Sequence, residues 1–180
     1  SARKNGVQAI SLKANDVLKW VRISHGEDEI ILLTKLGQAI RFSESDVRPM
    51  GRIAAGVKAM RLKGKDEVVG FDIIPIGKTK DLELLVIGEN GFGKKTSLEE
   101  YRHQSRGGSG VKTAKVTEKT GAIAAAMLLD QECTDLIMIS AKGQVIRTPM
   151  ATIPSLSRAT QGVRMMKLDA GDKVASVGCI

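Results

Sequence analysis

Two glycine-centred motifs recur three times in this chain at a constant separation. The first is a glycine that precedes a short basic segment, and the second is a glycine followed by Val and a basic residue. In every copy the second glycine follows the first by 19 residues. Such regularity is typical of repeat proteins, in which each unit buries its apolar surface against its neighbours. The three pairs are Gly37 and Gly56, Gly91 and Gly110, and Gly143 and Gly162.

Each repeat contains four short segments with the composition of β-strands. The first is an apolar run, the second follows the first glycine, the third follows the Gly-Val motif, and the fourth is again apolar. These segments are rich in β-branched residues and are bounded by Gly, Asp, Asn and Ser, which favours strands over helices. Four strands in each unit are typical of propeller blades. The apolar runs are Ile30–Leu33, Leu84–Ile87, Leu136–Ile139, Val68–Phe71, Ile123–Met127 and Val174–Val177.

The repeats divide the chain into a partial unit and three complete ones. Residues 6–12 match the Gly-Val motif and residues 17–20 match the fourth segment, so we interpret residues 1–27 as the end of a preceding blade. Trp20 occupies the position of core residues in later copies and is expected in the core. We predict an all-β, propeller-like pinwheel fragment whose blades form an open arc cut from a longer array. Its repeats are residues 28–77, 78–130 and 131–180.

The charge balance indicates an anionic partner. Lys and Arg number 28 against 20 Asp and Glu, which gives a net charge of +8 and a pI near 9.6. A surplus of this size is typical of proteins that bind nucleic acid, a membrane surface or an acidic protein. Aromatic residues make up only 3% of the chain, and single-stranded nucleic acid needs several aromatic platforms for stacking. Duplex nucleic acid is therefore the favoured partner.

Composition also bears on the cellular compartment. No run approaches the ~20 apolar residues of a membrane span, so we expect no membrane association. The two cysteines, Cys133 and Cys179, lie in apolar contexts without CxxC spacing. We expect them to be buried thiols in a reducing compartment, with neither a disulfide nor a metal site between them. A cytoplasmic protein follows.

Basic residues fall in four columns that are in register with the repeat. One column lies on the strand after the first glycine, one lies in the loop before the Gly-Val motif, and two lie on the strand after that motif. In a radial array each column becomes a row of charges that can track a DNA backbone without reading bases. The columns are Arg41, Lys95 and Arg147; Arg52, Arg106 and Arg158; Lys58, Lys112 and Arg164; and Arg61, Lys115 and Lys167.

Some residues suggest catalysis without a supporting arrangement. Residues 88–94 approach a phosphate-binding loop, but the Ser or Thr that would hold magnesium is replaced by Lys95. Tyr101 is the only tyrosine and has no carboxylate cluster beside it in the sequence. The only histidines, His25 and His103, form no triad or metal-ligand grouping. We therefore expect no cofactor and no catalytic residue in this chain.

Residues 104–110 resemble a family signature. Gln104, Arg106, Gly107, Gly108 and Gly110 match the gyrase box Gln-Arg-Arg-Gly-Gly-Lys-Gly, whose first Arg and Lys are replaced here by serines. The segments at 43–51, 90–96 and 160–163 are also similar to the last three blades of the DNA gyrase A C-terminal domain. The resemblance covers essentially the whole chain. Because the family's box normally lies in the first blade, we interpret residues 104–110 as a degenerate copy.

The resemblance implies a six-bladed β-pinwheel with strands exchanged between neighbouring blades. Its basic rim wraps duplex DNA within an ATP-dependent type IIA topoisomerase that introduces negative supercoils. The implied partners are the remaining blades and catalytic domains of gyrase A, the gyrase B protein, and the bacterial nucleoid in the cytoplasm. Three and a half repeats leave sheet edges open, so self-association is also expected.

Two alternatives remain open. The equivalent domain of the topoisomerase IV protein that corresponds to gyrase A shares the blades and usually lacks a good box. A propeller that serves as a protein-interaction scaffold belongs to a different functional class and predicts weak DNA binding. The sequence does not show which face of each blade meets DNA.

Overall fold

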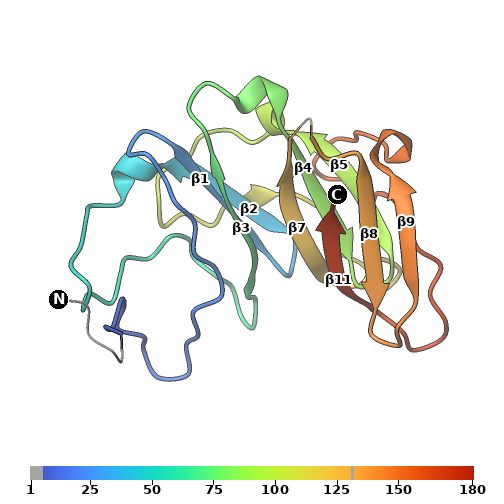
Figure 1. Ribbon diagram of the computed structural model, residues 1–180, viewed down its shortest axis with the longest axis horizontal. Helices are drawn as coiled ribbons and strands as arrows, with labels where there is room; N and C mark the ends of the chain where they lie inside the picture. Colours follow the sequence, from blue (N-terminus) through green and yellow to red (C-terminus); the bar gives the residue numbers. More distant parts are fainter. Residues whose placement is uncertain (1–5, 131) are drawn as a thin grey trace.

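The computed structural model describes residues 6–130 and 132–180, in which three antiparallel sheets lie side by side in chain order (Figure 1). The strands are β1 (Glu29–Thr34), β2 (Gln38–Ser43), β3 (Val68–Ile74), β4 (Glu83–Gly88), β5 (Phe92–Ser97), β6 (Val111–Lys112), β7 (Ile123–Leu129), β8 (Asp135–Ser140), β9 (Val145–Pro149), β10 (Val163–Arg164) and β11 (Val174–Cys179). Four 3-10 turns are η1 (Glu44–Asp46), η2 (Thr79–Asp81), η3 (Leu98–Glu100) and η4 (Met150–Thr152). The prediction of an all-β, propeller-like fold is confirmed. None of the helices in these residues has the length and apolar character needed to cross a bilayer.

Each repeat begins with a β-hairpin closed by the first glycine of the pair. Gly37, Gly91 and Gly143 have φ values of 81°, 78° and 86°, a region that favours glycine. Their amides donate to the carbonyl three residues earlier, at 3.0 Å in each copy. Residues 88–91 are therefore a plain hairpin turn between β4 and β5, and their likeness to a phosphate-binding loop has this structural explanation.

The third segment of a repeat joins the sheet of the preceding repeat. Sheet one has the order β3-β1-β2-β6, in which β6 comes from the second repeat. Sheet two has the order β10-β5-β4-β7, in which β10 comes from the third repeat. This is the strand exchange of a pinwheel. Sheet three, β11-β8-β9, has three strands in the described residues rather than four, because this position in the other sheets is filled by the following repeat.

The core lies between the sheets. Alternate residues of a strand point to opposite faces of its sheet. Strand β4 accordingly contributes Leu84 and Val86 to the apolar cluster that it shares with sheet one. It contributes Leu85 and Ile87 to the cluster that it shares with sheet three. Burial on both faces explains why the first segment of each repeat is an uninterrupted apolar run.

The N-terminal part of the chain differs from the prediction. Residues 6–28 form no strand, and neither does the Gly-Val segment at residues 56–62. The strand after a Gly-Val motif pairs with the second strand of the preceding repeat. The described residues contain no second strand of a preceding repeat with which residues 6–12 or 56–62 could pair. Trp20 is half-buried and lies outside the three core clusters, so the prediction of a core position was wrong.

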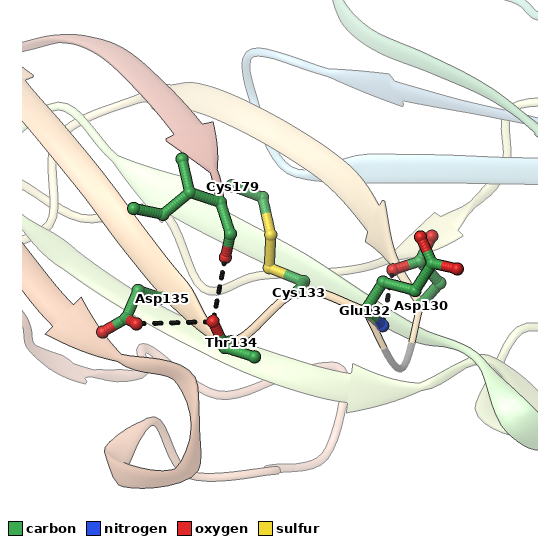
Figure 2. The surroundings of a disulfide bond; sticks show 7 residues. Asp130, Glu132, Cys133, Thr134, Asp135 and Cys179 are labelled. Carbon is green, nitrogen blue, oxygen red and sulfur yellow. Dashed lines mark hydrogen bonds between the residues drawn. A yellow bond between two sulfur atoms is a disulfide. The ribbon is translucent and has the colours of Figure 1, made fainter.

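The prediction of two buried free thiols was also wrong. Cys133 and Cys179 form a disulfide with a Cα–Cα distance of 5.7 Å (Figure 2). Cys179 is exposed. The antiparallel register places Cys179 opposite Leu136, close to the segment that precedes β8. The two cysteines are 46 residues apart, so only the pairing of β8 with β11 brings them together.

Candidate nucleic-acid interface

Adjacent repeats meet where the third segment of one repeat pairs with the second strand of the preceding repeat, and we call this contact a joint. The joints bring predicted basic residues together. At the first joint the amide of Thr113 donates to the carbonyl of Gly37, at 2.9 Å. At the second joint the amide of Met165 donates to the carbonyl of Gly91, at 2.8 Å. These are equivalent positions, so the two joints share one hydrogen-bond register. The basic columns therefore occupy equivalent places at successive joints.

The loop before each Gly-Val motif packs onto the preceding repeat. Arg106 donates from Nε to the carbonyl of Asp46, at 3.0 Å, and from Nη1 to the carbonyl of Lys58. Arg158 donates from Nη1 to the carbonyl of Lys112, at 3.0 Å, which repeats the second contact one joint further along. Arg106 and Arg158 are half-buried and connect adjacent repeats, whereas Arg52 of the same column is exposed.

The box-like segment belongs to this joint. The amide of Gln104 donates to the carbonyl of Arg41, at 2.8 Å, and the amide of Gly107 donates to the carbonyl of Ala59, at 2.7 Å. The carbonyl of Gly108 accepts from the amide of Arg61, at 2.7 Å. Gly110 has φ 77° and meets the backbone of β2 so closely that a Cβ there would lie 2.5 Å from the Ala39 oxygen. These residues of the box hold two repeats together.

The column on the second strand pairs with acids on the first strand. Arg41 is buried; its Nε donates to Glu29 at 2.7 Å, and Nη1 donates to the carbonyls of Leu98 and Tyr101. The fold encloses its guanidinium, so Arg41 is left out of the DNA-binding surface proposed below.

The same pairing recurs in the other two repeats. Lys95 pairs with Glu83, at 2.9 Å, and Arg147 pairs with Asp135, at 2.8 Å. The hydrogen bond from Arg147 lowers the pKa of the Asp135 carboxyl, and the same contact raises the pKa of Arg147. Lys95 is half-buried and Arg147 is exposed. This column is a set of cross-strand ion pairs that stabilise the hairpins.

The two columns on the segment after the Gly-Val motif are exposed and unpaired among the described residues. All six side chains are exposed, and none forms an ion pair within residues 6–130 and 132–180. The guanidinium of Arg164 also lies over the ring of Phe92, 5.4 Å from its centroid. We call these six residues the anchor cations. They are Lys58, Arg61, Lys112, Lys115, Arg164 and Lys167.

One buried cation was not predicted from the sequence. Lys94 is buried, and its Nζ donates to the carbonyls of Ser157 and Arg158, at 2.5 and 2.6 Å. Burial lowers its pKa to about 8. The signal was present in the repeat alignment, because Ile40 stands at the same position in the first copy. Lys94 fastens the loop that carries Arg158.

Tyr101 has a structural place in the first joint. Its side chain is buried, and its hydroxyl lies 2.6 Å from Thr113 Oγ1. Burial raises its pKa, so the phenol is a poorer nucleophile than a free tyrosine. Of the two histidines, His25 contacts Asp28, and His103 lies 3.9 Å from Glu29.

Comparison with known proteins identifies relatives of this arrangement. The family described as "DNA gyrase C-terminal domain, beta-propeller" matches residues 1–25, 28–75, 82–130 and 134–180. The DNA gyrase A protein of Staphylococcus epidermidis is 44% identical over 174 residues, which cover 97% of this chain and 19% of that protein. The relative in Staphylococcus aureus is 40% identical over the same length. The chain thus spans about a fifth of the length of these curated relatives.

Two solved structures resemble the fold closely. The C-terminal domain of DNA gyrase A superposes with a TM-score of 0.85 at 27% identity, covering 98% of this chain and 59% of that one. The C-terminal domain of DNA topoisomerase IV superposes with a TM-score of 0.89 at 27% identity, covering 100% of this chain and 55% of that one. Both similarities extend over all three sheets.

Proposed function

The chain belongs to the DNA gyrase C-terminal domain family, and from this premise we propose that it is a non-catalytic module that binds duplex DNA through its anchor cations. The observation that supports the proposal most strongly is the selective exposure of these residues. Among the other repeated cations, Arg41, Lys95 and Arg147 pair with acids, and Arg106 and Arg158 donate to carbonyls of the neighbouring repeat. Arg52 alone of this set is exposed without either contact in the described residues, whereas all six anchor cations face solvent. An unpaired cation can neutralise a phosphate without first breaking an internal contact.

The arrangement suits backbone contact rather than base reading. Two anchor cations recur at each Gly-Val segment. The segments of the second and third repeats join sheets one and two, which follow one another along the molecule (Figure 1), whereas Lys58 and Arg61 lie on a segment that forms no strand. Duplex DNA carries one negative charge per ~1.7 Å of axis, so a spaced row of cations can follow a curved duplex of any sequence. Preference among sequences would then arise from DNA deformability.

In the whole protein this module is proposed to work within the gyrase A component of a bacterial gyrase. The wrapped DNA would be presented to catalytic domains elsewhere in gyrase A, in an ATP-dependent enzyme that introduces negative supercoils together with gyrase B. The remaining blades, a location in the bacterial cytoplasm and nucleoid, and the absence of a cofactor in this part belong to the same proposal. The relatives at 40–44% identity, all gyrase A proteins, support gyrase as the parent.

The second candidate is the corresponding module of topoisomerase IV. Its C-terminal domain has the higher TM-score of the two solved structures at the same identity. The serines at positions 105 and 109 of the box-like segment also weaken the gyrase signature. The two candidates share the DNA-binding role and differ in the topological outcome of the parent enzyme. Adding negative supercoils to relaxed DNA would separate gyrase from topoisomerase IV.

The experiment is a salt-dependent titration of labelled duplex with two variants of equal charge. One variant replaces Lys58, Lys112 and Arg164 with Gln. The matched control replaces three exposed lysines outside the columns, Lys65, Lys78 and Lys80, with Gln.

The expected results distinguish the two variants. The slope of log affinity against log salt falls by about 0.9 for each phosphate that is no longer neutralised, so the anchor variant should lose about 2–3 units of slope and the control should lose little. Equal reductions in the two variants would show that only net charge matters. A salt-independent affinity would favour the protein-interaction scaffold.

A further inference from the structure

The disulfide joins two positions at which the other repeats have no cysteine. The chain has two cysteines, and both lie where the third repeat begins and ends. The register of β11 with β8 matches that of β7 with β4, so Cys179 corresponds to Leu128 of the second repeat. By the same alignment Cys133 corresponds to Asp81. The disulfide is therefore a feature of the third repeat and not of the pattern that the repeats share.

The covalent bond reinforces a short backbone connection at the end of β11. The amide of Ile180 donates to the carbonyl of Asp135, and the amide of Asp135 donates to the carbonyl of Ile180, both at 3.0 Å. Thr134 adds a hydrogen bond from its hydroxyl to the same Ile180 carbonyl, at 3.2 Å (Figure 2). Strand β11 pairs with β8 and forms the edge of sheet three, so these contacts and the disulfide hold its end.

The ring that the disulfide closes contains the whole third repeat. It runs from Cys133 through β8, β9 and β10 to Cys179, and it includes the anchor cations Arg164 and Lys167. A bond that joins the ends of such a segment restricts the conformations available when the segment opens. The bond therefore restricts opening of the third repeat itself, and most directly of β11, whose end it joins to the segment before β8.

The disulfide is accessible from one side. Cys179 is exposed, whereas Cys133 is half-buried and packs against the apolar cluster between sheets two and three. Thiol–disulfide exchange requires a thiolate to reach a sulfur atom, so this position permits exchange in the folded protein. A structural disulfide buried in a core would be shielded from the same reaction.

We propose that Cys133 and Cys179 form a reversible redox latch on the third repeat. The reversibility rests on the proposed function, because accessible disulfides in the bacterial cytoplasm face a reducing thiol pool.

The disulfide forms in two steps with a low-molecular-weight disulfide such as glutathione disulfide. One thiolate attacks the oxidant, forming a mixed disulfide and releasing one glutathione. The second thiolate displaces the other glutathione, so the two cysteines lose two electrons and two protons and the oxidant becomes two thiols.

The test uses the whole chain equilibrated in glutathione buffers of graded reduced-to-oxidised ratio. Alkylation with a maleimide that adds mass counts free thiols on a gel, and amide hydrogen exchange reports opening of β11, residues 174–179. The control variant replaces Cys133 and Cys179 with Ser. In oxidising buffer the native chain is expected to show no free thiol. Its β11 amides are expected to exchange about tenfold or more slowly than in reducing buffer, whereas the control exchanges at the fast rate in both buffers.

The other outcomes would overturn the latch. Two free thiols in oxidising buffer would show that the bond does not form. A disulfide that persists in the most reducing buffer would be permanent and not reversible. Equal exchange rates in both buffers would show that the bond does not hold β11. None of these results depends on DNA, so failure of the latch and failure of the DNA-binding proposal are distinguishable.

Discussion

Replacing Gly110 with Ala tests the strand exchange directly, and Gly56→Ala is its internal control. The two glycines stand at the same position of successive repeats, and their φ values are 77° and 79°. A Cβ on Gly110 would lie 2.5 Å from the carbonyl oxygen of Ala39, on the partner strand β2. A Cβ on Gly56 would have no neighbour within 4 Å. The two substitutions therefore carry the same backbone strain and differ in the contact across the joint.

The expected magnitudes follow from this geometry. An alanine at positive φ costs ~1–2 kcal/mol, and the loss of glycine's freedom in the unfolded chain offsets ~0.4–1 kcal/mol of that cost. Gly56→Ala should therefore lower the unfolding free energy by about 1 kcal/mol. Gly110→Ala adds an overpacked contact worth ~1–3 kcal/mol and weakens the backbone hydrogen bonds of β6, each worth ~1 kcal/mol. Its total should be about 3–5 kcal/mol.

Urea unfolding followed by circular dichroism measures the difference between the two variants. Gly162→Ala at the second joint should behave like Gly110→Ala, because its Cβ would meet the carbonyl of Gly93 in the same way. If Gly56→Ala and Gly110→Ala differed by less than about 0.5 kcal/mol, β6 would not be packed on β2 as described, and the pinwheel joint would be refuted.

Three further changes probe the basic side chains. Arg41→Ala should lower the unfolding free energy by about 3 kcal/mol because it leaves buried acceptors without a donor, whereas Arg147→Ala should cost under about 1 kcal/mol; equal urea midpoints would contradict this contrast. Lys94 has a folded pKa of about 8 and a higher value when unfolded, so the unfolded chain binds more protons between these values and stability should rise with pH from 8 to about 10.5. Unfolding free energies from urea curves at pH 7.5 and 9.5 should show this rise, by up to about 2 kcal/mol, in the native chain but not in Lys94→Met. Arg106→Ala with Arg158→Ala should loosen the contacts between repeats that position the anchor cations, and so weaken binding to all duplex sequences alike; a loss confined to one sequence would count against this positioning role.

The repeat made most of the fold predictable from sequence. The 19-residue spacing located the turn glycines and the first, second and fourth strands, because local composition determines these hairpins. The destination of the third strand was not visible in the residues themselves. Pairing of β6 with β2 or of β10 with β5 is a long-range choice, and it was expected here only through the family resemblance. The missing strand at residues 56–62 has the same cause.

The disulfide and the buried lysine show a second limit. Cys133 and Cys179 are 46 residues apart, and nothing in the sequence around either cysteine places it beside the other. Only the register of β8 with β11 does so. Lys94 was treated as one basic residue among many, although isoleucine stands at its place in the first repeat. A charged residue at an apolar repeat position was the signal that could have identified it.

The position of each strand in its sheet explains why one basic column forms ion pairs while another stays unpaired. Arg41, Lys95 and Arg147 lie on strands whose neighbours in the same sheet begin with an acid, so a cross-strand ion pair forms in every copy. Strands β6 and β10 are sheet edges and have no neighbour on their outer side among the described residues. Charges on an edge also discourage unwanted strand pairing, which offers an alternative reason for their presence.

The number and placement of the anchor cations distinguish these two explanations. Protection of an edge strand needs one charge within the strand, and β6 and β10 already have Lys112 and Arg164. The additional cations Lys115 and Lys167 lie beyond these strands, where no edge remains to be protected. Edge protection therefore accounts for one cation at each joint, whereas a row of phosphates accounts for both. Replacing Lys115 and Lys167 alone should consequently lower DNA affinity and its salt slope without promoting aggregation.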